Sequence, residues 1–305
     1  MSSVIYQRIP RWLLFVGPFL VLAGAIVLLL LFTPLGDLAA AEEAETQDML
    51  WTMVSIGVIV GIIPVAIGML WFPFMQTLRP YHLHVVLALS AGVLAFVGFE
   101  MTREVLSYVA AYPQPVEAGG LALLAFVLTF AGMIGVSKWN HARIKQSGHR
   151  GLNVAYMIAL GLGLHSLGEG IAIGSALFSG EVSLAILLII GFVLDNVTEG
   201  PTVVAAVSRD AQTPPLYHFM VLGLIAGGPV IIGGWIAVLL FDPLLAAALL
   251  SVGIAAIAQV IWEVIDLIRF DARSIIDLGI VSGFVGGFVF MFILDEILIG
   301  MIILN

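Results

Sequence analysis

Residues 152–178, LNVAYMIALGLGLHSLGEGIAIGSALF, and residues 182–208, VSLAILLIIGFVLDNVTEGPTVVAAVS, decide how this chain folds. Each run is longer than the roughly 20 mainly apolar residues that an α-helix needs to cross a bilayer. A very short connection separates the runs, so we expect the two helices to be antiparallel neighbours. Each run carries ionisable side chains near its middle, where such groups are unfavourable and by default mark a functional site.

The composition of the whole chain is that of a membrane protein. Of its 305 residues, 61% are hydrophobic and only 10% are charged, whereas soluble domains have about 25% charged residues. The sequence has no cysteine, which excludes disulfides and thiolate metal ligands. Its net charge of -9 argues against a nucleic-acid partner.

The apolar runs predict an all-α, polytopic protein of the cell membrane that spans the bilayer nine times. The predicted spans are 11–33, 51–73, 82–108, 119–139, 152–178, 182–208, 216–241, 244–268 and 276–303. With the N-terminus in the cytoplasm, ten of the 11 lysines and arginines fall on the cytoplasmic side, and only Arg103 falls elsewhere. The positive-inside rule therefore predicts a cytoplasmic N-terminus and an outer C-terminus.

Two short motifs in the opening stretch carry candidate metal ligands. They are HSLGEG at 165–170 and DNVTEG at 195–200, and each places a metal-capable side chain four residues before a glutamate. Residues i and i+4 share one helix face, so each helix presents a pair of ligands to its neighbour. The two pairs are His165 with Glu169 and Asp195 with Glu199, and Ser166 and Asn196 lie beside them.

This set of side chains predicts a site for a divalent cation near the middle of the membrane. Imidazole and carboxylate ligands suit a borderline ion such as zinc. Three carboxylates in a low dielectric repel one another or take up protons unless a cation lies between them. The alternative, polar side chains that only hold two helices together, stays open at this stage.

The two motif helices resemble the fourth and fifth core helices of the ZIP family of divalent metal transporters. The resemblance implies that residues 51–305 form an eight-helix transport domain. Residues 1–50 would add one transmembrane helix and an acidic outer loop. The basic segment 138–150 lies where the family has a cytoplasmic loop that often carries histidines.

The resemblance also assigns roles to the motif residues. It implies that His165 is a ligand of a primary site and that Glu169 and Glu199 are shared or bridging carboxylates. Asp195 stands where the family often has histidine or glutamine and is still a competent ligand. Asn196 matches an amide or acid position of the second motif.

Some positions depart from the family pattern. Ser166 replaces the usual asparagine, and Gly168 and Thr198 replace the usual proline before each glutamate. Gly228 precedes Pro229 where the family often has glutamate, so a ligand of a secondary site is missing. We therefore expect an intact primary site and a weakened or missing second one.

One more ligand is expected from the span at 82–108, and the sequence offers two candidates. Glu100 suits a hard or borderline ion, whereas Met101 favours softer ions. The register of this helix against the motifs does not decide between them. An interfacial Glu100 paired with Arg103 is the alternative that needs no metal.

Together these features predict transport of a divalent transition metal toward the cytoplasm by alternating access. Zinc is favoured, while iron, manganese and cadmium stay open. The ion would be the substrate and no permanent cofactor is expected; the partners are the bilayer and, as the resemblance allows, a second copy of the chain. We expect protonation of Glu169 or Glu199 to accompany release.

Two other functions compete with transport as interpretations of this sequence. A relative that binds metal without transporting it, as a sensor or scaffold, fits the absence of a glutamate ligand at position 228. An intramembrane metalloprotease needs two histidines and a base as H-E-x-x-H on one helix, and here Glu169 stands in place of the second histidine. We therefore do not expect an enzyme.

Overall fold

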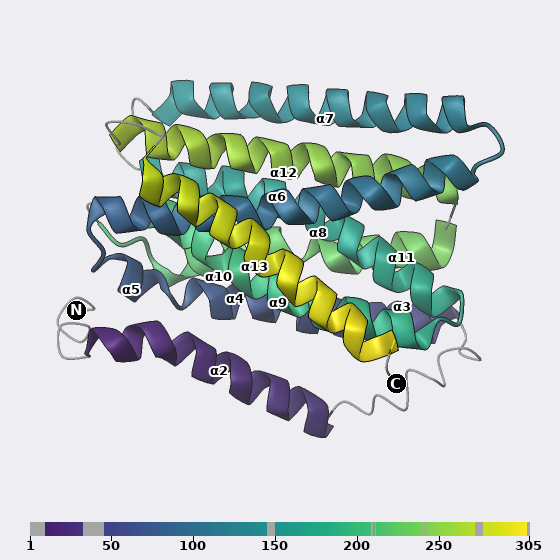
Figure 1. The fold of residues 1–305 in the computed structure, drawn as a ribbon, viewed down its shortest axis with the longest axis horizontal. Helices are drawn as coiled ribbons and strands as arrows, with labels where there is room; N and C mark the ends of the chain where they lie inside the picture. The colour runs from purple at the N-terminus through teal and green to yellow at the C-terminus, as the bar shows by residue number, and fades with distance from the viewer. Residues whose placement is uncertain are drawn as a thin grey trace.

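Helices, most of them long and apolar, make up the regular structure of the described residues in this computed structural model (Figure 1). The structure describes residues 10–32, 46–144, 150–208, 210, 212–240, 242–271 and 277–303. The helices are α2 (Arg11–Phe32), α3 (Thr46–Gly57), η2 (Val58–Ile62), α4 (Ile63–Met69), α5 (Phe72–Met75), α6 (Pro80–Ala111), α7 (Pro115–Ile144), α8 (Arg150–Phe178), α9 (Val182–Val207), α10 (Leu216–Gly227), α11 (Pro229–Leu240), α12 (Pro243–Asp271) and α13 (Leu278–Ile303).

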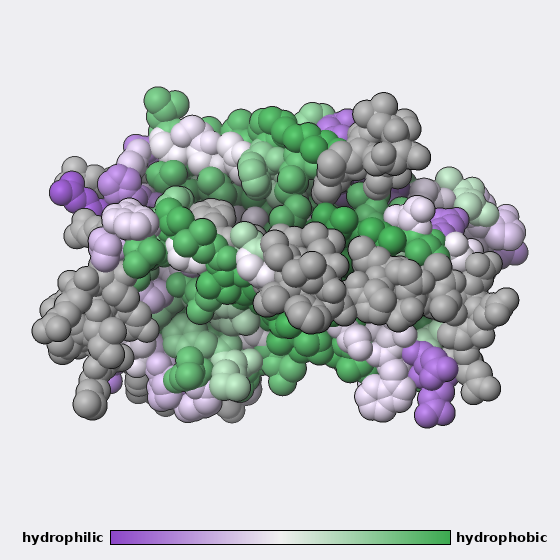
Figure 2. Space-filling model, turned by 90° about the horizontal axis from the view of Figure 1, so that it is seen from below, coloured by the Kyte–Doolittle hydropathy of each residue, from purple (hydrophilic) through white to green (hydrophobic). Residues whose placement is uncertain are grey.

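Eight of the predicted spans correspond to helices that are long and apolar enough to cross a membrane. They are Thr46–Met75, Pro80–Ala111, Pro115–Trp139, Gly151–Phe178, Val182–Val207, Leu216–Leu240, Pro243–Arg269 and Leu278–Ile297. Apolar surface dominates the middle of the face seen in Figure 2, and most of its hydrophilic surface lies toward the two ends. The described residues are thus all-helical, as predicted, and their eight long apolar helices indicate a multi-pass membrane protein.

The remaining predicted span, 11–33, corresponds to helix α2, which lies along one edge of the bundle (Figure 1). It packs on α4 and α5. The indole Nε1 of Trp71 donates to the carbonyl oxygen of Phe15 at 2.9 Å. These contacts are few, so α2 is peripheral to the other helices, and its crossing of the membrane stays a prediction.

Two of the spans are interrupted where proline and glycine occur. The span Thr46–Met75 passes through a π-helical turn, η2, before α4 begins at Ile63, and Pro64 is the second residue of α4. The span Leu216–Leu240 is divided between α10 and α11 at Gly228, because Pro229 has no N–H to continue the helical hydrogen bonds. The interruptions meet: a Cβ on Gly61 of η2 would lie 2.2 Å from the carbonyl oxygen of Gly227.

The helices form two groups that meet along α8. In one group α6 packs against α12 and α13, and α7 covers α12 from the outside; in the other, α8 packs against α9, α10 and α11. Helix α8 also packs on α12, which joins the groups. In Figure 1, α7 and α2 lie at opposite edges of this assembly, and α13 crosses it obliquely.

Glycines bring α8 and α11 into backbone contact. A Cβ on Gly170 would lie 2.0 Å from the carbonyl oxygen of Val230, and one on Gly233 would lie 2.0 Å from that of Leu167. Such close approach is typical of helix packing in membranes. It fixes the rotation of α8 and therefore the direction in which its motif side chains point.

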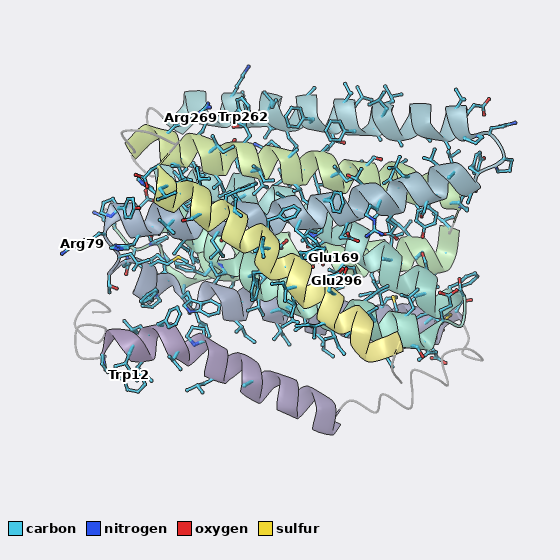
Figure 3. All side chains as sticks on the ribbon, viewed as in Figure 1. Trp12, Arg79, Glu169, Trp262, Arg269 and Glu296 are labelled. Carbon is cyan, nitrogen blue, oxygen red and sulfur yellow. The ribbon has the colours of Figure 1, made fainter. Side chains whose placement is uncertain are left out.

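The ends of α8 and α9 that lie away from their short connection are also tied together. Asp210, which follows α9, accepts hydrogen bonds from the backbone N–H groups of Gly151 and Leu152, each at 2.8 Å. A carboxylate at a helix N-terminus is favourable because it satisfies free N–H groups and the helix dipole. Arg79 and Arg269 are labelled toward the same end of the bundle in Figure 3, the end predicted to face the cytoplasm.

Candidate functional site

The motif side chains of α8 and α9 are buried together in the middle of the bundle. His165 is 1% exposed and Glu169 is 2% exposed, and on α9 Asp195 is 8% and Glu199 is 1% exposed. Ionisable groups at this depth are rare unless they are paired or bind an ion. The structure therefore brings together the four side chains that the two motifs predict to be ligands.

The imidazole of His165 is the common neighbour of two carboxylates. Its Nε2 lies 3.5 Å from Oε1 of Glu169 and 3.6 Å from Oε1 of Glu199. Asp195 lies in the electrostatic range of both glutamates. Within the described part of the chain, Nε2 of His165, Oε1 of Glu169 and both Glu199 oxygens have no hydrogen-bond partner.

Met101 contacts the other nitrogen of the same imidazole. Its Sδ lies 3.1 Å from Nδ1 of His165, and a thioether sulfur can only accept a hydrogen bond. Nδ1–H is therefore the donor, and in the neutral ring Nε2 carries a lone pair. That lone pair faces the carboxylates of Glu169 and Glu199.

Asn196 orients one of the two glutamates. Its Nδ2 donates to Oε2 of Glu169 at 2.8 Å and to the carbonyl oxygen of Phe192 at 2.9 Å. The other oxygen of Glu169, Oε1, is thereby left to face His165. A hydrogen bond of this kind fixes a carboxylate before it binds an ion.

Further oxygens beside these groups are buried without a hydrogen-bond partner among the described residues. Ser166 Oγ, Asn196 Oδ1 and Thr202 Oγ1 belong to this set, and all three residues are 0% exposed. Thr202 lies three residues after Glu199 and therefore one helical turn along the same face. Buried unpaired oxygens are unfavourable, and a bound cation or water would satisfy them.

The separations of the imidazole from the carboxylates match ligands of a single ion. Two ligands at about 2.1 Å from a tetrahedral zinc are about 3.4 Å apart, close to the observed 3.5 and 3.6 Å. In the described residues, however, no three histidine, aspartate or glutamate side chains already form a complete metal-binding group. The arrangement is two imidazole–carboxylate pairs that share His165.

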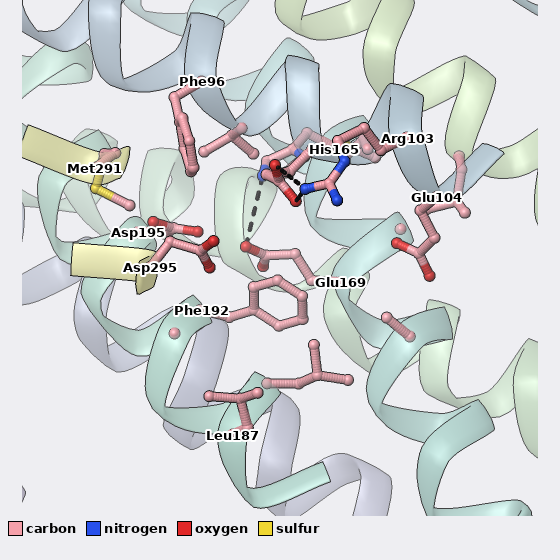
Figure 4. A pocket seen from close by; sticks show the side chains of 18 of the residues that line it. Phe96, Arg103, Glu104, His165, Glu169, Leu187, Phe192, Asp195, Met291 and Asp295 are labelled. Carbon is pink, nitrogen blue, oxygen red and sulfur yellow. Dashed lines mark hydrogen bonds and ion pairs between the residues drawn. The ribbon is translucent and has the colours of Figure 1, made fainter. Parts of the chain in front are cut away.

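A cavity of about 480 Å³ leads to these side chains. His165, Glu169, Asp195 and Met101 line its inner part, and Figure 4 shows His165 and Glu169 pointing toward each other there. The cavity reaches the surface near the exposed residue Arg103. Its walls join the two helix groups, because they come from α6, α8, α9, α12 and α13.

The structure separates the two candidates on α6. Met101 is 7% exposed and contacts His165. Glu100 instead accepts two hydrogen bonds from Nη1 of Arg103, at 2.9 and 3.1 Å. Met101 is thus part of the buried group, whereas Glu100 lies on the wall of the cavity nearer the surface.

A separate polar group is buried between α7 and α12. Oε1 of Glu263 accepts hydrogen bonds from Ser137 Oγ and from Gln259 Nε2, the latter at 2.8 Å. None of these three residues is among those that line the cavity described above. This glutamate is therefore stabilised by protein donors, unlike Glu199.

No protein-family model matches this chain, and none of the curated proteins matches it.

Sequence reasoning missed several features of the site. Pro201 lies inside α9, two residues after Glu199, and removes the N–H that would otherwise bond to the carbonyl oxygen of Val197. A search for proline before the glutamate overlooks a proline that follows it. Thr202 could have been found by extending the spacing of Asp195 and Glu199 by one turn.

Proposed function

We propose that this protein transports a divalent transition-metal ion across the membrane, with zinc as the favoured ion. The observation that carries the proposal is Nε2 of His165, which lies 3.5 and 3.6 Å from two buried carboxylates and has no hydrogen-bond partner among the described residues. Groups that can only accept hydrogen bonds do not attract one another, so a cation between them is the natural complement. The mixture of imidazole and carboxylate favours zinc.

The ligands we propose are His165, Glu169, Glu199 and Asp195, with Asn196 holding Glu169 in place. Ser166 supplies a further buried oxygen beside them. Met101 sets the imidazole tautomer through Nδ1. In this assignment the ion is a substrate, and the reaction involves no covalent chemistry, so the protein is not an enzyme.

The cavity suggests how the ion reaches the site. It connects the surface near Arg103 with Asp195 and Glu169, whereas Glu199 is not among its lining residues. We propose that this is the outward-facing half of an alternating-access cycle, in which the α8–α11 group moves against the α6, α7, α12 and α13 group. Transfer of the ion past Glu199 and protonation of the glutamates would complete release to the cytoplasm.

The proposal includes membership of the ZIP family, nine spans with a cytoplasmic N-terminus, and a place in the cell membrane. The eight long apolar helices and the basic residues Arg79 and Arg269 toward one end support this orientation. The extra span would be α2, and the eight helices after it would be the transport domain. Cysteine-accessibility labelling at single sites introduced into the cysteine-free chain tests this topology directly.

Equilibrium binding of Zn²⁺ to the purified protein, with wild type beside His165→Ala, is the decisive first experiment. We expect at least about a 100-fold loss of affinity in the variant, because the shared ligand is removed. Competition among Zn²⁺, Fe²⁺, Mn²⁺ and Cd²⁺ in the same assay ranks the ions. Uptake into proteoliposomes separates a transporter from a sensor or scaffold, which would bind the ion without moving it.

A further inference from the structure

The wall of the cavity nearer the surface contains a positive charge that the transport of cations does not explain. Among the described residues that line the cavity, Arg103 is the only lysine or arginine. Glu100, Glu104 and Asp295 line the same cavity. A cation that moves inward therefore passes an arginine held among acidic side chains.

The guanidinium of Arg103 forms an ion pair with one of these carboxylates. Its Nη1 donates to both oxygens of Glu100, at 2.9 and 3.1 Å, and the two residues are three positions apart on α6. Asp295 and Glu296 on α13 lie within its electrostatic range. The side chain of Arg103 is 65% exposed, so it can leave this position without unpacking the helix.

We propose that Arg103 is the resident counter-cation of the cavity mouth and limits the access of metal ions to the buried site. A metal ion meets Glu100 only after the guanidinium has been displaced from it. Arg103 thus acts by competition and repulsion, not as a metal ligand. This inference rests on the proposed transport function and adds to it a residue that sets the concentration dependence of uptake.

The size of the effect follows from the exposure of the pair. Solvent-exposed ion pairs contribute little, and their removal changes an equilibrium by about 1.5- to 5-fold at most. We expect Arg103→Gln to lower the apparent KM for Zn²⁺ uptake by about two- to fivefold at low ionic strength. The maximal rate should be unchanged, because Arg103 does not contact the buried ligands.

The dependence on salt distinguishes this role from a structural one. Removing Arg103 leaves the mouth more negative, so its attraction for cations becomes stronger and is screened more by salt. The difference in KM between the variant and wild type should therefore shrink as ionic strength rises to about 1 M, where the Debye length is about 3 Å. Arg103→Lys retains the charge and should restore most of the wild-type KM.

A second exposed ion pair, outside the cavity, provides a matched control for the Arg103 variants. Arg269 and Asp266 form a second i, i+3 pair of similar exposure, 54% and 47%, with N and O 3.9 Å apart. Neither residue lines the cavity. Arg269→Gln should therefore leave both the KM and its salt dependence at the wild-type values.

The experiment is Zn²⁺ uptake into proteoliposomes as a function of zinc and salt concentration for wild type, Arg103→Gln, Arg103→Lys and Arg269→Gln. A lower KM confined to Arg103→Gln, lost at high salt, supports the inference. Uptake by wild type with an unchanged or higher KM in Arg103→Gln overturns the inference alone. Absence of uptake by wild type overturns the proposed function, and the inference with it.

Discussion

Replacing Glu199 with glutamine tests the metal site by the sign of two opposite effects. Glu199 is 1% exposed, and both of its oxygens lack a hydrogen-bond partner among the described residues. If it is a metal ligand, the metal-free protein gains nothing from its charge. Glu199→Gln should then be at least as stable as wild type without metal, because a buried charge that lacks hydrogen-bond donors is unfavourable.

The effect with metal has the opposite direction. At a metal concentration 100 times Kd, binding stabilises the folded wild type by about 2.7 kcal/mol. Loss of a charged ligand should weaken binding by at least about 100-fold. At the same metal concentration the variant is then stabilised by only about 0.4 kcal/mol.

These free energies predict measurable shifts in melting temperature. For a chain of this size, 1 kcal/mol corresponds to about 2–4 °C. We expect Zn²⁺ to raise the Tm of wild type by about 5–10 °C and that of Glu199→Gln by about 1 °C. The assay is thermal unfolding in detergent, followed by tryptophan fluorescence, with a zinc titration of each protein.

Glu263→Gln is the control, since it changes a buried glutamate that does not line the cavity. Oε1 of Glu263 accepts hydrogen bonds from Ser137 and Gln259, and the amide oxygen of glutamine accepts them more weakly because it is not charged, so Glu263→Gln should lower the stability of the metal-free protein by about 1 kcal/mol. Its zinc-induced shift should stay at the wild-type value. A Glu199→Gln protein that is less stable without metal, yet keeps the full zinc shift, would refute the ligand assignment.

Three further predictions concern the surroundings of the site. Met101→Leu preserves the side-chain volume but removes the hydrogen-bond acceptor for Nδ1 of His165. Equilibrium binding should therefore show about a tenfold weaker affinity for Zn²⁺, Cd²⁺ and Mn²⁺ alike. A loss of affinity confined to the softer Cd²⁺ would instead make Met101 a direct ligand. Asn196→Ala removes the hydrogen bond that holds Glu169 and should weaken Zn²⁺ binding by about 10- to 100-fold. Thr198→Ala loses only a hydrogen bond to the carbonyl oxygen of Asp195 and should keep the wild-type affinity. Equal affinities of the two variants would contradict the role of the Asn196 amide. Gly170→Ala places a Cβ 2.0 Å from the carbonyl oxygen of Val230 and should destabilise the protein by about 1–3 kcal/mol in thermal unfolding. Gly132 has open space around it, so Gly132→Ala should stabilise α7 by up to about 1 kcal/mol. Destabilisation by both substitutions would point to a cause other than the α8–α11 contact.

Much of the fold could be predicted from the sequence because membrane spans depend on length and hydrophobicity alone. The runs 152–178 and 182–208 agree closely with α8 and α9. Interruptions within spans were not predicted. The division at Gly228 is marked by Pro229, whereas the π-helical turn Val58–Ile62 has no signal in an apolar sequence and depends on packing against Gly227.

The site was predicted as far as helix periodicity extends. The spacing of His165 to Glu169 and of Asp195 to Glu199 places each pair on one face, and a short connection makes the helices neighbours. The choice between Glu100 and Met101 depends on the rotation of α6 against α8, which one sequence does not contain. In the structure this rotation places Sδ of Met101 3.1 Å from Nδ1 of His165, whereas Glu100 pairs with Arg103.

The backbone contact between α8 and α11 has a consequence for biosynthesis. During translation α8 and α9, with their three buried carboxylates, reach the membrane before α11 and α12, which complete their surroundings. At about 5–20 residues per second, the roughly 60 residues from the end of α9 to the end of α12 take about 3–12 s to synthesise. Each acid exposed to lipid in that interval is unfavourable by about 2.5–3.5 kcal/mol. The antiparallel pair is therefore expected to leave the translocon as a hairpin with its acidic faces turned inward.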